Sequence, residues 1–568
     1  MIRHMNVLLA AVAGLIMALA VPNEVFPMGN GVLGLVALAP YFLALMRVRR
    51  ARWASLVGVA FAITSTIGSN YWLAYFREFS VWTLGGTTFG YMGYHALLGP
   101  FIWRIGHTRP HLRPILLGIA WAGYEYLKSI GFLAYPWGLI AFPFNDIPLL
   151  LQHVDVTGIW ATSFLAATAN ALIAEILHRR DTVHPVLPRW PRDLRWSRVT
   201  NQEALRVAAL FGILVAIVAG YGGFRLARPP KVTDTIEVTL VQQNIDSWLA
   251  GNEWPSVRAA QELTRAALTE RESPPDLIVW SETVLRRPFP ENRAVFRQLP
   301  EGDPFVPFVR SLPAPLVTGA PSIQRVDPFE PVNSAILLDQ QGRYYGFYGK
   351  RHLVPMAENV PFWEVPLMRR FFENVIGVVG VWTPGDRWAV FAMPRHPARA
   401  STSAWDEAGV TGVPPDPAKT GHEVGTSVGD ELIRFGTPIC YEDSFGYLCR
   451  EFALLGADLL INVTNNSWSQ TRSAQIQHYV SARYRAVENR MALARATNSG
   501  YTAVVDAQGE VLADIPMFVQ DYLNATVPLY GEQGLTFYSR FGDYLARFWI
   551  LVSIAALVGF FVRDRRRI

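Results

Sequence analysis

Long apolar windows constrain the fold of this chain more than any other feature. They cover residues 5–21, 31–46, 54–73, 81–103, 115–127, 157–177, 207–224 and 544–562. Most approach the roughly 17–25 residues with which a helix crosses ~30 Å of hydrocarbon, although the second, the fifth and the last are short or interrupted. Because several windows follow the first, we interpret it as a span rather than a cleaved signal peptide. The sequence therefore predicts an α-helical transmembrane domain of about eight spans: about seven helices at 1–226, and one helix with a basic tail at 544–568.

Arginine residues predict the orientation of these spans. They gather in the loops after the second, fourth and sixth windows, at Arg47, Arg49, Arg50, Arg52, Arg104, Arg109, Arg113, Arg179, Arg180, Arg189, Arg192, Arg195 and Arg198, and again in the C-terminal tail. By the positive-inside rule both termini face the cytoplasm, so the long segment before the last window lies on the outer side of the membrane. These arginines also account for the net charge of +5, so we expect no nucleic-acid partner.

The segment 227–543 has the pattern of a soluble α/β domain. Short apolar runs of β type cover 236–243, 276–282, 314–321, 333–342, 434–442, 458–465 and 501–509, and helical patterns cover 257–270 and 476–497. Strands that alternate with helices predict an α/β fold. Residues 394–429 are rich in Pro, Ala, Ser, Thr and Gly and lack apolar periodicity. We therefore expect a mobile inserted loop there.

Three residues at the ends of predicted strands are candidates for cysteine chemistry, which needs a thiolate, a proton acceptor and a positive group for the oxyanion. Cys440 ends RFGTPIC and is one of only two cysteines, Glu282 ends DLIVWSE, and Lys350 follows YYGFYG. A partly desolvated carboxylate at a strand end suits a general base. Taken singly, however, such a cysteine is more often a packing residue, and such a glutamate or lysine is more often a solvated surface residue.

The order of the motifs favours function over packing. The runs WSE at 280–282, K-x-H-L-V-P-x-x-E at 350–358 and C-Y-E at 440–442 together resemble the nitrilase superfamily with its Glu-Lys-Cys triad. A membrane domain precedes them, with AYPWG at 134–138 and DVTGIWATSFL at 155–165, and one span follows. With these features the chain resembles the membrane-embedded apolipoprotein N-acyltransferase family. The resemblance implies a nitrilase-like αββα sandwich (carbon-nitrogen hydrolase domain) at 227–543.

The same resemblance implies roles for individual residues. Glu282 matches the general base, Lys350 the oxyanion-stabilising lysine and Cys440 the nucleophile. Supporting or substrate-binding positions fall on Glu358, Glu442, Tyr441, Asn333 and a tryptophan, which is either Trp254 or Trp248 because SWLAGNEW is spaced differently from the family. An arginine of the family falls on Arg369 or Arg370, and Ser281 stands where the family usually has proline.

The resemblance also implies an activity. The protein is expected to transfer a fatty acyl chain from a membrane phospholipid, phosphatidylethanolamine in particular, through a Cys440 thioester. The acceptor is the N-terminal α-amino group of the diacylglyceryl-cysteine of apolipoproteins, in the last step of lipoprotein maturation. The expected setting is a monomer in the bilayer of a bacterial inner membrane, with the catalytic domain on the periplasmic side and no cofactor. Aromatic and apolar residues at 361–382 suggest an arm that gates lipid entry, with ordinary core packing as the alternative.

Other interpretations remain at this stage. A membrane-tethered amidase or nitrilase-type hydrolase would resolve the thioester with water, and a transporter or sensor would only bind ligand in its outer domain. Glu125 lies within the fifth apolar window, where a carboxylate is either functional or satisfied by water or Lys128. Cys449 fits a packing role. No Cys-x-x-Cys pair occurs, and no metal site is predicted.

Overall fold

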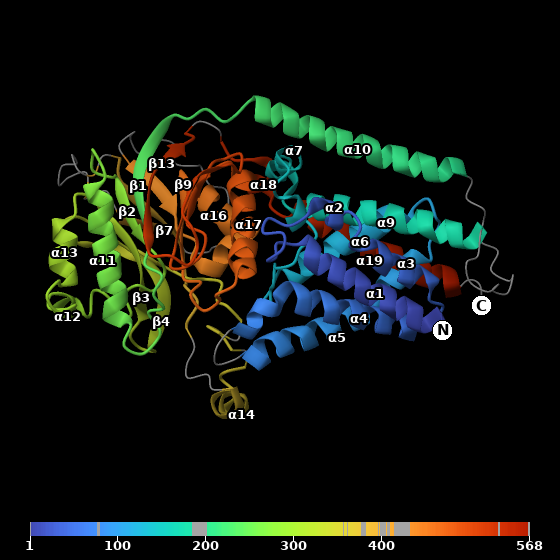
Figure 1. Ribbon diagram of the computed structural model, residues 1–568, viewed down its shortest axis with the longest axis horizontal. Helices are drawn as coiled ribbons and strands as arrows, with labels where there is room; N and C mark the ends of the chain where they lie inside the picture. Colours follow the sequence, from blue (N-terminus) through green and yellow to red (C-terminus); the bar gives the residue numbers. More distant parts are fainter. Residues whose placement is uncertain are drawn as a thin grey trace. The chain divides into compact units, whose positions relative to one another are not determined.

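The computed structural model describes residues 2–75, 80–183, 201–355, 357–360, 362–376, 382–395, 397, 405, 409–413, 432–531 and 534–565. The chain divides into two compact units (Figure 1). The first combines residues 1–228, 471–480 and 543–568, and the second combines 229–470 and 481–542. The first unit is helical and the second contains both β-sheets.

The helices of the first unit follow the predicted apolar windows. They are α1 (Ile2–Ala20), α2 (Gly31–Gly34), α3 (Ala39–Arg47), α4 (Ala51–Asn70), α5 (Ser80–Gly106), α6 (Arg113–Lys128), α7 (Pro148–Leu151), α8 (Val154–Thr157), α9 (Trp160–Val183), α10 (Asn201–Ala227) and α19 (Tyr544–Arg565). Within the described ranges, three helical stretches are long and apolar enough to cross a membrane: Ala51–Tyr75, Trp160–Arg179 and Leu205–Ala227. The count of about eight spans therefore stays a prediction.

The second apolar window, 31–46, forms two helices rather than one, and the Asn170 side chain binds the backbone between them. Helix α2 ends at Gly34 and α3 begins at Ala39, so the regular helical hydrogen-bond pattern is interrupted between them. The fully buried Asn170 of α9 accepts hydrogen bonds from the backbone N–H groups of Leu38 and Ala39, and it donates to the carbonyl of Gly34. A polar residue inside an apolar helix thus satisfies a backbone that hydrocarbon could not.

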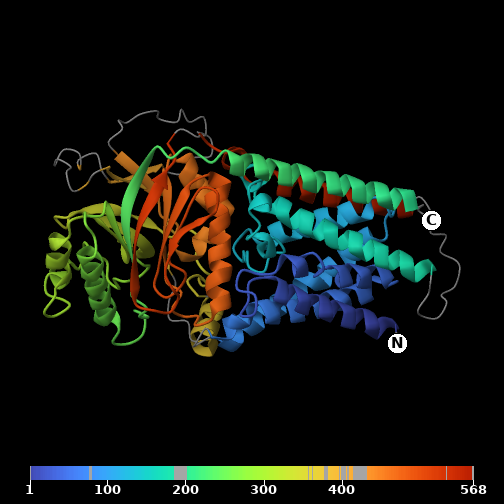
Figure 2. The same ribbon diagram turned by 45° about the horizontal axis from the view of Figure 1, so that its top comes forward.

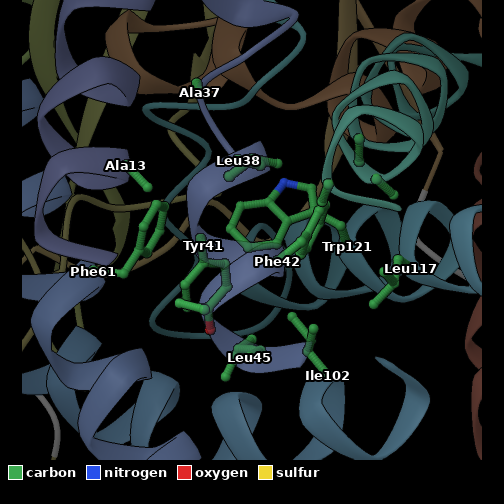
Figure 3. Packing of buried hydrophobic residues seen from close by; sticks show 14 of the residues in the cluster. Ala13, Ala37, Leu38, Tyr41, Phe42, Leu45, Phe61, Ile102, Leu117 and Trp121 are labelled. Atoms are coloured by element: carbon green, nitrogen blue, oxygen red, sulfur yellow. The ribbon is translucent and has the colours of Figure 1, made fainter. Parts of the chain in front are cut away.

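Aromatic side chains fill the centre of the helical unit (Figure 3). Tyr41 and Phe42 of α3 meet Phe61 of α4 and Trp121 of α6, and all four are at most 2% exposed. The Tyr41 and Phe61 rings stack at 4.6 Å between centroids, whereas Trp121 meets Phe61 edge-on at 5.7 Å. These geometries are the ones that aromatic quadrupoles favour, so α3, α4 and α6 share one core.

The Glu125 carboxylate is bound by hydrogen-bond donors within the helical unit. Its carboxylate accepts hydrogen bonds from Trp121 Nε1 at 3.0 Å, from the backbone N–H of Ile140 at 2.8 Å and from Ser163 Oγ. The Lys128 ammonium donates to the carbonyl of Trp137. These contacts fasten the loop after α6 to α6 and α9.

Residues 471–480, the start of helix α17 (Arg472–Asn489), belong to the first unit by their packing. The fully buried Gln477 donates from Nε2 to the carbonyls of Pro22 and Ser69, each at 2.9 Å. The Glu24 carboxylate accepts from the backbone N–H of Ser473, which satisfies a donor in the first turn of α17.

The second unit is built on two β-sheets. The six-stranded sheet has the order β13-β1-β2-β3-β4-β5 and the seven-stranded sheet the order β12-β11-β10-β9-β8-β6-β7. The strands are β1 (Asp234–Gln242), β2 (Leu277–Trp280), β3 (Leu316–Arg325), β4 (Glu330–Leu338), β5 (Tyr344–Gly349), β6 (Trp388–Pro394), β7 (Gly409–Val413), β8 (Leu432–Gly436), β9 (Leu459–Thr464), β10 (Ala492–Thr497), β11 (Ala503–Val505), β12 (Val511–Asp514) and β13 (Asp521–Leu529). Strands β1, β2 and β3 run parallel to one another, as do β8, β9 and β10, whereas the pairs β1–β13, β3–β4, β6–β8 and β10–β11 are antiparallel.

Helices cover the outer faces of both sheets. Helix α11 (Glu253–Thr269) packs on β1 and β13, with α12 (Arg293–Phe296) and α13 (Phe305–Ser311) on the same side. Helix α16 (Gly446–Leu454) packs on β6 and β8 of the other sheet. Figure 2 shows the two sheets between these helical layers. The described part of the second unit is therefore a four-layered αββα sandwich.

Two predictions at the element level differ from the structure. The helix expected at 476–497 ends at Asn489, because Arg490 adopts a left-handed φ of 54° and the fully buried ALARAT becomes β10 beside β9. Within the loop expected at 394–429, residues Gly409–Val413 form β7 and pair antiparallel with β6. Most of the rest of that loop, including the predicted mobility, lies outside the described residues.

Helices α4 and α5 approach so closely that glycine is required at the crossing. A Cβ atom on Gly99 of α5 would lie 2.3 Å from the carbonyl oxygen of Ala54, whereas one on Gly93 of the same helix would meet nothing within 4 Å. We expect Gly99→Leu to force the helices apart and destabilise the protein by about 1–3 kcal/mol, the usual cost of overpacking. Thermal unfolding in detergent should show a lower midpoint for Gly99→Leu and a nearly unchanged one for the control Gly93→Leu. Equal midpoints for the two variants would contradict the close crossing.

Candidate active site

The three residues singled out in the sequence follow three strands. Glu282 lies just beyond β2 and Lys350 directly after β5, both in the six-stranded sheet. Cys440 follows β8 of the seven-stranded sheet and opens the 3₁₀ turn Cys440–Ser444. The nucleophile candidate and the two charged candidates therefore come from different sheets of the sandwich.

Lys350 lies between two carboxylates. Its ammonium Nζ is 3.3 Å from Glu282 Oε1 and 2.9 and 2.8 Å from the two oxygens of Glu358. Asn333 of β4 donates from Nδ2 to the same two residues, at 2.7 Å to Glu282 and 3.0 Å to Glu358. The side chains of Lys350 and Glu282 are only 1% and 5% exposed. This cluster unites three of the residues predicted from sequence with the triad lysine.

Electrostatics keeps the lysine charged. Burial alone would lower the pKa of Lys350, but the Glu282 and Glu358 carboxylates, with Cys440, raise that pKa well above its ordinary value. A buried ammonium is tolerated only with such partners. The cluster thus maintains a fixed positive charge beside two acceptors.

A backbone N–H group binds the second oxygen of Glu282. Its Oε2 accepts a hydrogen bond from the backbone N–H of Asn465, just after β9, at 2.8 Å. The chain at Glu282 also lies directly against β3, because a Cβ on Gly319 would be 2.5 Å from Glu282 Cα and 2.2 Å from Thr283 N. Only glycine permits this approach. The carboxylate is therefore fixed from both sheets.

Cys440 occupies a strained position at the start of its turn. It is 8% exposed, forms no disulfide and has a φ of +50°, a left-handed conformation that residues other than glycine seldom adopt. Burial, followed by the nearby Glu282 charge, raises the pKa of the Cys440 thiol well above its ordinary value, and Lys350 opposes this rise. The resting thiol is therefore neutral, and forming the thiolate requires transfer of its proton to a neighbour.

Glu442 connects the turn Cys440–Ser444 (the cysteine turn) to the residues that follow Lys350 (the lysine segment). One of its oxygens accepts from the backbone N–H of Ile439, and the other accepts from the backbone N–H groups of Arg351 and His352. The Tyr348 hydroxyl donates to both oxygens. Burial raises the pKa of Glu442 to about 7, although these backbone donors oppose the rise. Glu442 thereby fixes the segment after Lys350 relative to Cys440.

Two further residues support the cysteine turn. The Tyr441 ring packs edge-on against Phe445, with centroids 4.9 Å apart, and lies 5.7 Å from His352. Asp443 pairs with the fully buried Arg495 of β10 at 3.1 Å, a contact that the sequence analysis missed. The available signal was an arginine inside the buried-type run ALARAT, because such an arginine needs a carboxylate partner.

The two candidate tryptophans have different surroundings. Trp254 of α11 packs against Phe296 in the core of the second unit. Trp248 is 44% exposed, and its ring lies 6.1 Å from that of Trp382, whose backbone N–H donates to the carbonyl of Glu358. The described contacts therefore connect Trp248, rather than Trp254, to the lysine cluster.

The remaining candidates lie elsewhere. Arg369 and Arg370 belong to α14 (Pro366–Phe371), and Cys449 is fully buried in α16. Within the ranges that the structure describes, no three His, Cys, Asp or Glu side chains gather so as to hold a metal ion.

Comparison with known proteins bears on the whole chain. Residues 237–533 match the family model described as "Carbon-nitrogen hydrolase", and residues 13–172 match the one described as "Apolipoprotein N-acyltransferase N-terminal domain". A protein of Treponema denticola named apolipoprotein N-acyltransferase 2 is 31% identical over 98% of this chain and 97% of its own length. Its namesake in Treponema pallidum is 33% identical over 98% of this chain and 95% of its own length.

Among solved structures, Saccharomyces cerevisiae Nit3, described as a member of the nitrilase superfamily, aligns at a TM-score of 0.33. It is 16% identical and covers 52% of this chain and 91% of its own. The matches to both family models and the near full-length identity with the two relatives show that this chain belongs to the apolipoprotein N-acyltransferase family, with a carbon-nitrogen hydrolase domain as its second unit.

Proposed function

We propose that this protein transfers a fatty acyl chain from a membrane phospholipid to the N-terminal α-amino group of diacylated apolipoproteins. The observation that carries the proposal is the buried cluster of Lys350, Glu282 and Glu358, whose charges act on the Cys440 thiol. Such a site supplies a nucleophile, a proton acceptor and a fixed cation for an oxyanion. The names of the two near full-length relatives, apolipoprotein N-acyltransferase 2, support the choice of acceptor.

The first half-reaction forms the thioester. Glu282 accepts the proton of the Cys440 thiol, and the thiolate attacks the ester carbonyl at the sn-1 position of the donor. The oxyanion that develops is stabilised by the Lys350 ammonium. When the tetrahedral intermediate collapses, the bond to the glycerol oxygen breaks and that oxygen takes the proton from Glu282. The products are a lysophospholipid and an acyl group on Cys440.

The second half-reaction resolves the thioester. The free α-amino group of the lipid-bearing N-terminal cysteine attacks the thioester carbonyl, and Lys350 again stabilises the oxyanion. Glu282 accepts a proton from the attacking nitrogen as the amide forms. The carbon–sulfur bond then breaks, and the proton passes from Glu282 to the departing Cys440 sulfur. The enzyme returns to its neutral-thiol state, and the product is a triacylated lipoprotein.

Further residues are assigned supporting roles. Glu358 and Asn333 hold Lys350 and Glu282 in place, and Glu442 holds the lysine segment against the cysteine turn. Tyr441 is proposed to line the acyl pocket. We assign the site tryptophan to Trp248 because of its contact with Trp382. No metal or cofactor takes part in this scheme.

The proposal includes a membrane setting. We propose about eight spans, at 1–226 and 544–568, with both termini cytoplasmic and the catalytic domain, 227–543, on the periplasmic side of a bacterial inner membrane. The donor is phosphatidylethanolamine and the protein is a monomer. Exposed apolar side chains around α14, at Phe362 (71%) and Leu367 (76%), support an arm that contacts acyl chains.

Incubation of the purified protein with labelled phosphatidylethanolamine should place an acyl adduct on Cys440, detected by mass spectrometry. Addition of a diacylated lipopeptide should discharge the adduct and give the N-acylated peptide. Cys440→Ser should form no thioester, whereas Cys449→Ser should behave as the wild type. Absence of an adduct would refute the acyltransferase proposal. Discharge of the adduct by water at the same rate with and without lipopeptide would indicate a hydrolase instead.

Glu442 should give stability a distinct pH dependence. Its folded pKa of about 7 lies above the ordinary value of 4.5, so its contribution is complete below about pH 4.5 and is lost as pH rises through 7. This difference corresponds to about 3 kcal/mol. Glu442→Gln should unfold at a lower midpoint at every pH, because its NH₂ group faces backbone donors. Its midpoint should, however, fall less than that of the wild type between pH 5 and pH 8, and parallel curves would contradict this assignment.

A further inference from the structure

Arg286 lies four residues after Glu282, and its guanidinium stacks on an exposed aromatic ring. Its Cζ is 4.9 Å from the centre of the Trp248 ring, and Trp248 is 44% exposed. Among the residues that the structure describes, no carboxylate pairs with Arg286. A positive charge is thus held in a defined place without a counter-ion from the described part of the chain.

The adjacent arginine provides a direct contrast. The guanidinium Cζ of Arg287 is 5.8 Å from the centre of the Trp254 ring. Arg287 also donates two hydrogen bonds to the Glu253 carboxylate, from Nε at 2.7 Å and from Nη2 at 3.2 Å. The two neighbours therefore share a cation–π contact, but only Arg287 has its charge matched by a bidentate carboxylate. An arginine held by stacking alone keeps its N–H edge available for a planar or tetrahedral anion.

The stacked pair lies beside the candidate active site. Ser247 donates from Oγ to the carbonyl of Thr283, the residue after Glu282, at 2.8 Å. On its other side the Trp248 ring contacts Trp382, which donates from its backbone N–H to the carbonyl of Glu358. The loop that carries Trp248 thus contacts Thr283, next to Glu282, and Trp382, which in turn is bonded to Glu358.

We propose that Arg286, held against Trp248, binds a phosphate group. This inference rests on the proposed function for the identity of the ligand: a glycerophospholipid carries its phosphate on the same glycerol as the ester that Cys440 attacks. A guanidinium binds phosphate through paired hydrogen bonds. Arg286 thereby recognises the phosphodiester of the acyl donor and favours phospholipids over neutral glycerides with the same acyl chains.

The test compares two donors and three variants of the full-length protein in detergent micelles. Acylation of Cys440 is followed by mass spectrometry, with phosphatidylethanolamine or with diacylglycerol of the same chains. Arg286→Ala should raise the apparent KM for phosphatidylethanolamine at least about tenfold and leave diacylglycerol turnover within about twofold of the wild type. Arg286→Lys should restore part of the affinity. The matched control, Arg287→Ala, should leave both donors unaffected.

Each contrary result is informative. Equal losses with both donors would overturn the proposal, because Arg286 would then only hold Trp248 in place. The same KM change in Arg287→Ala would also overturn it, because a general surface charge would suffice. Inorganic phosphate should compete with phosphatidylethanolamine in the wild type but not in Arg286→Ala. Loss of phosphate competition without a change in the lipid KM would assign the site to free phosphate and refute the lipid identity.

Failure of the proposed function has a separate signature. In that case the wild type would gain no adduct from either donor. Thermal unfolding with added glycerol 3-phosphate would then still report on Arg286, with a raised midpoint in the wild type and Arg287→Ala but not in Arg286→Ala. An equal shift in all three proteins would refute a phosphate site at Arg286 whatever the reaction.

Discussion

The burial of the Lys350 ammonium between Glu282 and Glu358 is the constraint on which the rest of the catalytic unit depends. A lone ammonium buried this deeply would lose its proton, and a lone buried carboxylate would gain one, because burial disfavours the charged form of each group. The surrounding structure therefore supplies partners for each group, with Asn333 donating to both acids and Asn465 donating to Glu282. Gly319 permits the close approach that fixes the Glu282 backbone. Removing one member would leave the others as unmatched buried charges.

Cys440 brings the other sheet to this cluster. Its left-handed backbone is sustained by Glu442, which binds the lysine segment, and by the Asp443–Arg495 pair, which binds β10. The neutral thiol and the charged lysine form a resting state in which the nucleophile gains reactivity only as its proton leaves. Arg286 differs from Lys350 in what holds its charge in place. The Trp248 ring contacts Arg286, whereas two carboxylates bind Lys350.

In the helical unit, buried polar side chains bind backbone groups at irregular stretches of the chain. Hydrocarbon offers no hydrogen bonds, so each irregular stretch of backbone needs a polar side chain from the protein. Asn170 covers the break between α2 and α3, Glu125 holds the loop after α6, and Gln477 binds two carbonyls at the ends of α1 and α4. Glu125, which the sequence offered as either functional or satisfied by a partner, has internal hydrogen-bond partners in Trp121, Ile140 and Ser163.

The sequence by itself determined the apolar windows, the α/β character of 227–543 and the candidates Glu282, Lys350 and Cys440, because hydropathy and short motifs are local properties. It misplaced the end of α17, since only pairing with β9 decides that ALARAT is a strand. The contacts that distinguish Trp248 from Trp254, the Asp443–Arg495 pair and the contrast between Arg286 and Arg287 came from the tertiary structure alone. In each case the decisive partner lies on another element, and spacing along the chain carries no information about which charges and rings meet in space.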